Sequence, residues 1–192
     1  MQTHSLQPKR VANMLAAAIG LFGLVGTAHA ATQGTAGTTS TGSVTINASI
    51  AARVAISNLN DITFADSDFA PVIGTGTSAQ KTDNVCAWSN NADRSYFITA
   101  SGSGTANAFT LASASNPVIP YSVSWAQSTG QTTGAALTAG TKSSKLISTA
   151  TTSTCGGGTD ATLIVAITGA NAETMLAGAA YTGTLTLLMT PT

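Results

Sequence analysis

The side chains that most often carry catalysis are scarce in this chain of 192 residues. Its two histidines, His4 and His29, both lie within the first thirty residues, and the rest of the sequence contains none. A serine, threonine or cysteine nucleophile needs a base within hydrogen-bonding reach, and histidine is the usual one. We therefore predict that residues 31–192 contain no catalytic residue and that the protein is not an enzyme.

Two neighbouring carboxylates are the strongest remaining candidates for chemistry. Asp66 and Asp68 are separated by one serine, and a pair of carboxylates can act as general acid and general base. The same pair could bind calcium, although a calcium site needs more carboxylates at fixed offsets. Residues 65–71 are typical of a loop, so we interpret both aspartates as solvated turn residues. We predict neither a metal nor a cofactor.

The first thirty residues have the pattern of a secretory signal peptide. Lys9 and Arg10 form a positive n-region, residues 14–25 form an apolar run, and Ala28–Ala30 supply a small-x-small cleavage pattern. The apolar run is shorter than the ~20 residues needed to cross a bilayer, so a retained membrane anchor is the less favoured alternative. We expect cleavage at this pattern and export of residues 31–192 as a soluble mature protein.

The mature region contains two cysteines, Cys86 and Cys155. In an oxidising compartment an even pair is most simply one disulfide. A metal or redox pair would be expected to show Cys-x-x-Cys spacing or histidine ligands, and neither is present. A bridge closing about 70 residues would restrict the unfolded chain by roughly 4 kcal/mol on the loop-entropy model.

Charges in the mature region are few and do not cluster. Without Lys9 and Arg10, five basic and seven acidic residues remain, which gives a net charge of −2. Nucleic-acid binding needs several clustered phosphate contacts, so we predict no nucleic-acid partner.

Short runs of alternating apolar residues recur along the mature region, separated by turns rich in glycine and serine. Such a pattern, without a long helical period, predicts an all-β sandwich. We expect a leader and first strand over residues 31–51 and a sandwich domain over residues 52–192. The predicted strands cover residues 43–51, 53–57, 62–65, 85–89, 95–101, 108–112, 119–126, 161–168 and 183–190, and one helical turn is expected within 172–177.

The tryptophans allow two interpretations. Trp125 shares a predicted strand face with Tyr121, and Trp88 shares one with Cys86. A tryptophan beside a buried disulfide is common in sandwich cores, which favours core packing. The alternative function is a monomeric secreted carbohydrate-binding module, in which Trp88, Trp125, Tyr96 or Tyr121 would form a solvent-facing platform.

The two ends of the mature region are its most informative part. Both carry apolar residues at every second position, and the last predicted strand ends two residues before the end of the sequence, so nothing follows to pair with it. A sandwich that lacks a final strand exposes an apolar groove and an unpaired edge. Residues 43–51 of a neighbouring copy could fill that groove by β-strand addition, or the same residues could be the domain's own first strand.

Three segments resemble the spore-coat-U-like pilins of archaic chaperone–usher systems and the related alternate-class fimbrial major subunits. These segments are Ser43–Ile50, Ile119–Trp125 and Ala177–Leu187, and the residues around both cysteines fit the same pattern. The likeness runs over nearly all of the mature region. One departure is that many such pilins have a cysteine soon after the first segment, whereas here Ala51, Ala52 and Arg53 follow it.

The resemblance implies an incomplete immunoglobulin-like sandwich that is completed by donor-strand exchange. It further implies partners: identical or related pilin subunits, a periplasmic chaperone and an outer-membrane usher, with a surface fimbria that supports adhesion or biofilm formation as the product. The absence of a second domain favours a shaft subunit over a two-domain tip adhesin. The donor positions carried over are Val44, Ile46, Ala48 and Ile50, and the expected acceptor-groove residues are Leu185, Leu187 and Met189.

Overall fold

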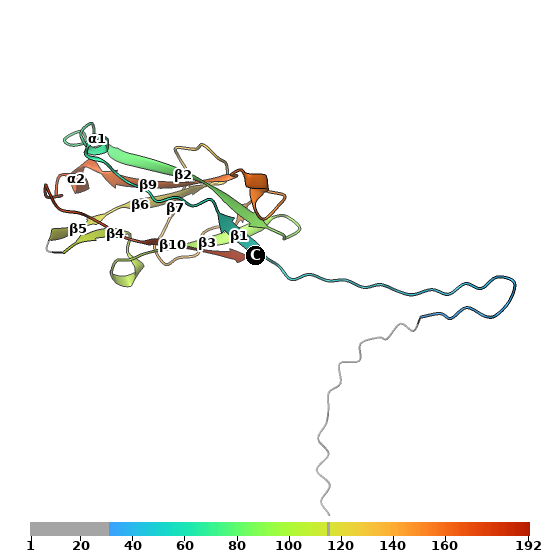
Figure 1. Cartoon of the computed structure of the whole chain (residues 1–192). Helices are drawn as coiled ribbons and strands as arrows, with labels where there is room; N and C mark the ends of the chain where they lie inside the picture. Colours follow the sequence, from blue (N-terminus) through green and yellow to red (C-terminus); the bar gives the residue numbers. More distant parts are fainter. Residues whose placement is uncertain (1–30, 115) are drawn as a thin grey trace, which may run out of the picture. The chain divides into compact units, whose positions relative to one another are not determined.

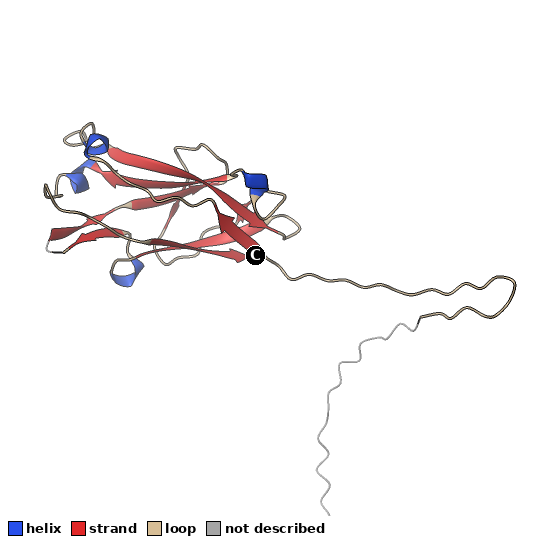
Figure 2. Ribbon diagram, viewed as in Figure 1, coloured by secondary structure: helices blue, strands red, loops and turns tan. Residues whose placement is uncertain are grey.

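A computed structural model of the chain describes residues 31–114 and 116–192, and in these ranges the regular secondary structure consists mostly of strands joined by loops (Figure 2). One antiparallel sheet has the strand order β1-β2-β9-β6-β7, a second has β10-β3-β8, and β4 and β5 form a separate pair. The strands are β1 (Val54–Ser57), β2 (Ser78–Ser89), β3 (Ser95–Gly102), β4 (Thr110–Ser113), β5 (Asn116–Pro120), β6 (Ser122–Ala126), β7 (Ala135–Leu137), β8 (Leu146–Ile147), β9 (Ala161–Thr168) and β10 (Leu185–Pro191).

The two sheets form the layers of an immunoglobulin-like sandwich, which confirms the predicted fold class (Figure 1). Alternate residues of the facing strands fill the space between the layers because side chains alternate across a strand. A second, smaller core lies around two one-turn helices, α1 (Asp66–Phe69) and α2 (Gly169–Ala172). Two short 3-10 turns, η1 (Thr105–Asn107) and η2 (Cys155–Gly157), complete the described elements. The main core contains Val85, Tyr96, Ile98, Val123, Trp125, Leu163, Val165 and Met189 among others.

Several predicted elements differ from those observed. Residues 62–65 form no strand, and α1 replaces the expected loop at the aspartate pair. Helix α2 begins earlier than the predicted helical turn, because the Thr168 hydroxyl caps it by accepting a hydrogen bond from the Asn171 N–H. Strand β2 begins at Ser78 instead of residue 85. The added half reads Ser-Ala-Gln-Lys-Thr-Asp-Asn, and its polar residues hide the alternation that identifies a strand.

The predicted disulfide is present, with Cys86 and Cys155 bonded at an S–S distance of 2.05 Å.

Trp125 lies in the main core with 1 % of its surface exposed, and its indole N–H donates a hydrogen bond of 3.0 Å to the Tyr96 hydroxyl. Burial raises the pKa of Tyr96 to about 12. Trp88 is half-buried and belongs to neither core cluster, contrary to the prediction that it packs inside.

The chain divides into two compact units between Ser49 and Ile50. In the first unit, Thr32 and Ser43 exchange two backbone hydrogen bonds of 2.9 Å. Residues 44–49 belong to no strand, contrary to the strand predicted over 43–51. Among the residues that the structure describes, no helix is long and apolar enough to cross a membrane.

Candidate functional site: an apolar groove beside β10

Strand β10 lies at the edge of its sheet. It pairs with β3 through seven residue pairs, from Leu185 opposite Gly102 to Pro191 opposite Tyr96. No other described strand pairs with its second edge. An edge strand presents a row of unpaired N–H and C=O groups, which makes it a template for another strand.

The chain that follows β1 forms the opposite wall of a groove. The ladder between β1 and β2 ends where Ser57 faces Cys86, and Asn58 then takes a left-handed conformation with φ of 61°. This turn carries residues 59–65, which we call the wall segment, away from the sheet edge. Within the described residues, the backbone groups of residues 61–64 form no hydrogen bond to another backbone group.

Between the wall segment and β10 lies a groove of about 820 Å³. Its floor is the inward face of β9, which contributes Leu163, Val165 and Ile167. Both walls and one end are also rich in apolar side chains. These are Leu59, Ile62 and Phe64 from the wall segment, Phe69, Leu111, Tyr121, Met175 and Tyr181 around the end, and Leu185 and Leu187 from β10.

Two polar contacts with β2 hold the wall segment in place. Asp83 accepts hydrogen bonds from the backbone N–H of Asn60 at 2.8 Å and from its side-chain amide at 2.9 Å. At the other end, the Asp68 carboxylate accepts from the Ala65 N–H at 2.7 Å and pairs with the Lys81 ammonium group at 2.7 Å. The hydrogen bond from Lys81, followed by that from Ala65, lowers the pKa of Asp68 below its ordinary value of 3.8.

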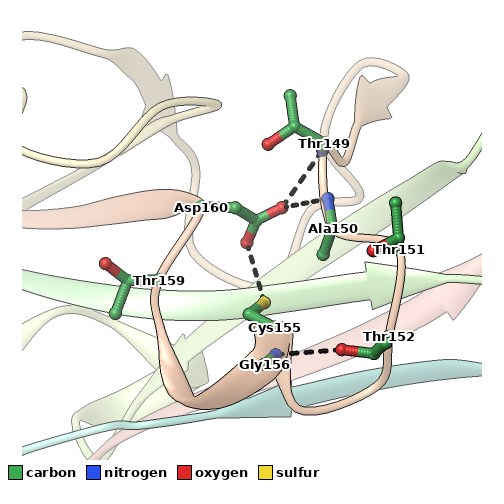
Figure 3. Close-up of a pocket in the computed structure, with 8 residues that line it drawn as sticks. All are labelled: Thr149, Ala150, Thr151, Thr152, Cys155, Gly156, Thr159 and Asp160. Atoms are coloured by element: carbon green, nitrogen blue, oxygen red, sulfur yellow. Dashed lines mark hydrogen bonds between the residues drawn. The ribbon is translucent and has the colours of Figure 1, made fainter.

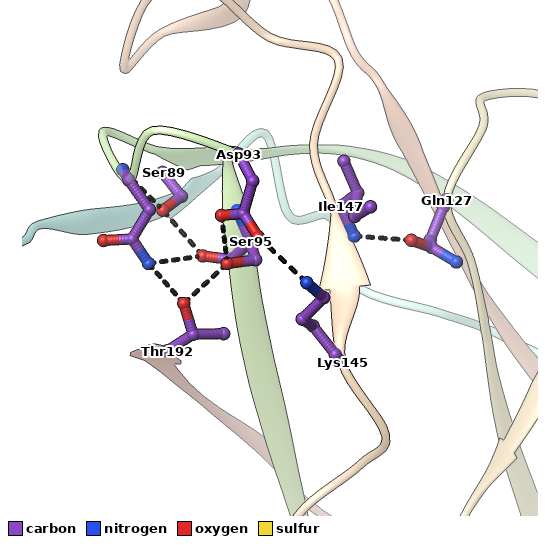
Figure 4. A network of polar contacts seen from close by, with 8 residues as sticks. Ser89, Asp93, Ser95, Gln127, Lys145, Ile147 and Thr192 are labelled. Carbon is purple, nitrogen blue, oxygen red and sulfur yellow. Dashed lines mark hydrogen bonds and ion pairs between the residues drawn. The ribbon is translucent and has the colours of Figure 1, made fainter.

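The far end of β10 is fixed by a polar network (Figure 4). The Thr192 hydroxyl accepts from the Asn91 side-chain amide at 2.7 Å and contacts the Ser95 hydroxyl, which donates to Asp93. Asp93 also pairs with Lys145 at 2.9 Å. The hydrogen bond from Ser95 and then that from Lys145 lower the pKa of Asp93. The edge strand that borders the groove is therefore anchored at its C-terminal end.

Of the expected acceptor residues, Leu185 and Leu187 line the groove. Met189 instead lies in the main core with 8 % of its surface exposed, and it does not border the groove. Most groove-lining residues carry no signal in the sequence that marks them as part of a binding site. The available signal is the alternation of Ile62 and Phe64 around Thr63, which predicts a strand of the domain and not a groove wall.

The expected donor residues are exposed in the single chain. Val44, Ile46 and Ile50 are 71 %, 86 % and 73 % exposed, and Ala48 is exposed as well. None of them pairs with a described strand. Large aliphatic side chains at this exposure leave apolar surface in water, which favours their burial against a partner.

A second, smaller cavity of about 300 Å³ lies beside the disulfide (Figure 3). Its buried carboxylate, Asp160, accepts hydrogen bonds from the N–H groups of Ala87 at 2.7 Å and of Thr149 and Ala150 at 3.2 Å. Asp160 and the two cysteine sulfur atoms are close enough to suggest metal ligands. Both sulfurs are bonded to each other, so neither offers the thiolate that a metal binds.

The remaining predicted sites are accounted for by local contacts. Asp66 begins α1 and is exposed, while Asp68 is engaged by Lys81. Burial of Tyr96 and Trp125 removes two of the four aromatic residues that a carbohydrate platform would use.

Comparison with known proteins gives limited further information. No protein-family model matches the chain, and no curated protein matches it. A similar solved structure comes from work on a chaperone–tip adhesin complex that is vital for synergistic activation of CFA/I fimbriae biogenesis. The two are 14 % identical with a TM-score of 0.48, and the match covers 73 % of this chain and 41 % of that one. The chain thus spans about two-fifths of the length of that protein.

Proposed function

We propose that this protein is a structural pilin subunit that polymerises into a surface fimbria. Residues 43–51 of one copy insert as a donor strand into the groove beside β10 of the next copy. The observation that carries this proposal is the groove itself: an apolar trough bordered by the free edge of β10 on one side and by unpaired wall-segment backbone on the other. A strand placed there would pair its backbone and bury one face of side chains.

The chemistry of the extension matches that of the groove. Val44 to Ile50 spans seven residues, which is the length of β10, and would extend about 20 Å at ~3.3 Å per residue. Its four alternating apolar residues would face the apolar floor and walls, while Thr45, Asn47 and Ser49 would face outward. Residues 31–52 carry no charge, so insertion buries no charged side chain.

Burial of the donor residues supplies the driving force for assembly. Covering Val44, Ile46, Ala48 and Ile50 contributes on the order of 5–8 kcal/mol per junction at ~25 cal/mol per Å², as an upper bound. Backbone hydrogen bonds along the strand add to this value and fix its register.

The proposal extends to the partners and location of the subunit. A subunit with an open apolar groove requires protection before assembly, which is the task of a periplasmic chaperone, and ordered export of subunits requires an outer-membrane usher. The product is a fimbria at the cell surface that supports adhesion or biofilm formation. We propose no enzymatic activity for the subunit.

The test is the variant Ile46→Asp, which places a charge on the donor face. It removes surface fimbriae while the chaperone-bound subunit remains in the periplasm, because an unpaired charge in an apolar groove costs several kcal/mol. Immunoblots of periplasmic and surface fractions measure both pools.

The matched control is Thr45→Asp, which adds the same charge one residue away on the outward face. This variant is expected to assemble fimbriae. Normal surface fimbriae in Ile46→Asp cells would refute the donor assignment, and depletion of the subunit from the periplasm would indicate that residues 43–51 belong to its own core.

A further inference from the structure

Asp83 is a buried carboxylate that binds the wall segment of the groove. Asp83 lies on the inward side of β2 and is 7 % exposed. Both of its oxygens are used by one residue, Asn60, through the backbone N–H and the side-chain amide. The ion pairs found among the described residues involve Asp68 and Asp93, so Asp83 has no cationic partner there. Burying a carboxylate costs free energy, and both bonds that offset this cost go to the wall segment.

The position of Asp83 explains what these bonds do. The ladder to β1 uses only residues 86–89 of β2, so the edge of residues 78–85 on that side has no strand. Asp83 and Lys81 are two residues apart on this half of β2 and share its inward face. Asp83 binds Asn60, and Lys81 pairs with Asp68. Strand β2 therefore holds the chain at both ends of residues 61–67.

We propose that Asp83 is a positioning residue for strand acceptance. By holding Asn60 with two hydrogen bonds, it fixes the position of the wall segment across the groove from β10. The inference rests on the proposed function, because the strand it concerns is residues 43–51 of a second copy. Without the two hydrogen bonds between Asp83 and Asn60 the wall segment can move. An incoming strand must then order the wall segment as it binds, and this lowers its affinity.

The test uses the full mature chain carrying Ile46→Asp as the acceptor, because that chain cannot donate. The probe is a fluorescent synthetic peptide of residues 43–51, and its association and dissociation are followed by anisotropy. With Asp83→Asn added, the new side-chain oxygen can still accept from the Asn60 backbone N–H. The new NH₂ group, however, faces the NH₂ group of the Asn60 side chain, and two donors form no hydrogen bond. Peptide affinity is expected to fall about tenfold, as when one hydrogen bond to a charged group is lost.

Two further variants separate positioning from simple destabilisation. Asp160→Asn alters another buried carboxylate, which lies beside the disulfide and does not border the groove. It is expected to lower the unfolding temperature without changing peptide affinity. Asn60→Asp added to Asp83→Asn restores a donor–acceptor pair with the roles exchanged and is expected to recover part of the lost affinity.

The binding results distinguish failure of the groove function from failure of the positioning role of Asp83. If the peptide does not bind the Ile46→Asp acceptor, the proposed groove function is wrong and the inference falls with it. If the peptide binds that acceptor and binds the Asp83→Asn acceptor equally well, the groove function stands and the positioning role is overturned. Should Asp83→Asn fail to fold, Asn60→Ala removes one of the two bonds and is expected to weaken binding by several fold, and unchanged binding would again overturn the role.

Discussion

At the scale of single residues, several carboxylates in this protein act as fixed acceptors for hydrogen bonds. Asp160 binds the N–H groups of three separate residues, and Asp83 binds two groups of Asn60. Asp68 and Asp93 each combine hydrogen bonds with a lysine partner. Carboxylates engaged in this way hold loops against strands, since a buried N–H without a partner costs more than its hydrogen bond gains.

Asp68 provides a prediction about pH. Its pKa is lowered chiefly by the hydrogen bond from Lys81, so the stability that this pair contributes is present above the ordinary aspartate value of 3.8 and is lost as the pH falls through the folded-state pKa. Lys81→Gln should raise the pKa of Asp68 toward its ordinary value. Carboxyl-carbon NMR titration of both proteins measures the shift.

The control for this titration is Asp93, whose pKa is lowered by the hydrogen bonds from Ser95 and Lys145, and Lys81→Gln changes neither group. The lowered pKa of Asp93 should be the same in both proteins. An Asp68 titration that does not change with Lys81→Gln would contradict the assigned cause.

At the scale of elements, the two faces of β10 differ: one lines the groove and the other faces solvent. Leu187 lines the groove and is half-buried, while its neighbour Leu188 points to the opposite face and is 57 % exposed. Leu187→Asp should lower the free energy of unfolding by about 1–2 kcal/mol, because a half-buried leucine contributes only part of the free energy that full burial of a leucine side chain supplies. It should also block strand acceptance. Leu188→Asp should change stability by no more than about 0.5 kcal/mol and leave assembly intact.

Mixing the variants tests the division between donor and acceptor. Leu187→Asp retains a working extension and Ile46→Asp retains a working groove, so each chain alone is expected to stay monomeric. A mixture of the two is expected to form a one-to-one dimer that grows no further. Light scattering after size exclusion measures these masses. Long polymers from Leu187→Asp alone would show that this face of β10 is not the acceptor.

Features encoded by neighbouring residues can be predicted from the sequence, whereas features that depend on contacts between distant residues cannot. Strand β9 was predicted with its observed limits because Leu163, Val165 and Ile167 alternate with no polar interruption on the buried face. The disulfide follows from an isolated pair of cysteines in a region whose preceding segment predicts export. The first half of β2 was missed because Lys81 and Asp83 occupy inward positions, where they bind the wall segment. Their partners are 13 and 23 residues away, and such contacts leave no periodic pattern.

At the scale of the whole molecule, the protein has two apolar features that a single chain leaves without partners. One is the groove beside β10, and the other is the exposed face of residues 44–50. Under the proposed function, the contact between copies would be head-to-tail because every copy carries both features, and such contacts generate open filaments when they do not close into a ring. The edge strand, an aggregation hazard in a monomer, would then be the site of ordered growth.

The most direct test locates the extension in the assembled protein. A mature chain in which Ile46 is replaced by the photo-crosslinking residue p-benzoylphenylalanine is mixed with a ¹⁵N-labelled chain that lacks the probe. After assembly and irradiation, mass spectrometry identifies the crosslinked peptides, and the isotope label shows whether a crosslink joins two copies. The account predicts crosslinks between copies, from position 46 to the groove-lining stretches 59–69, 163–167 and 179–187 or to Leu111, Tyr121 or Met175. Crosslinks only within one copy, or between copies at any other surface, would contradict it.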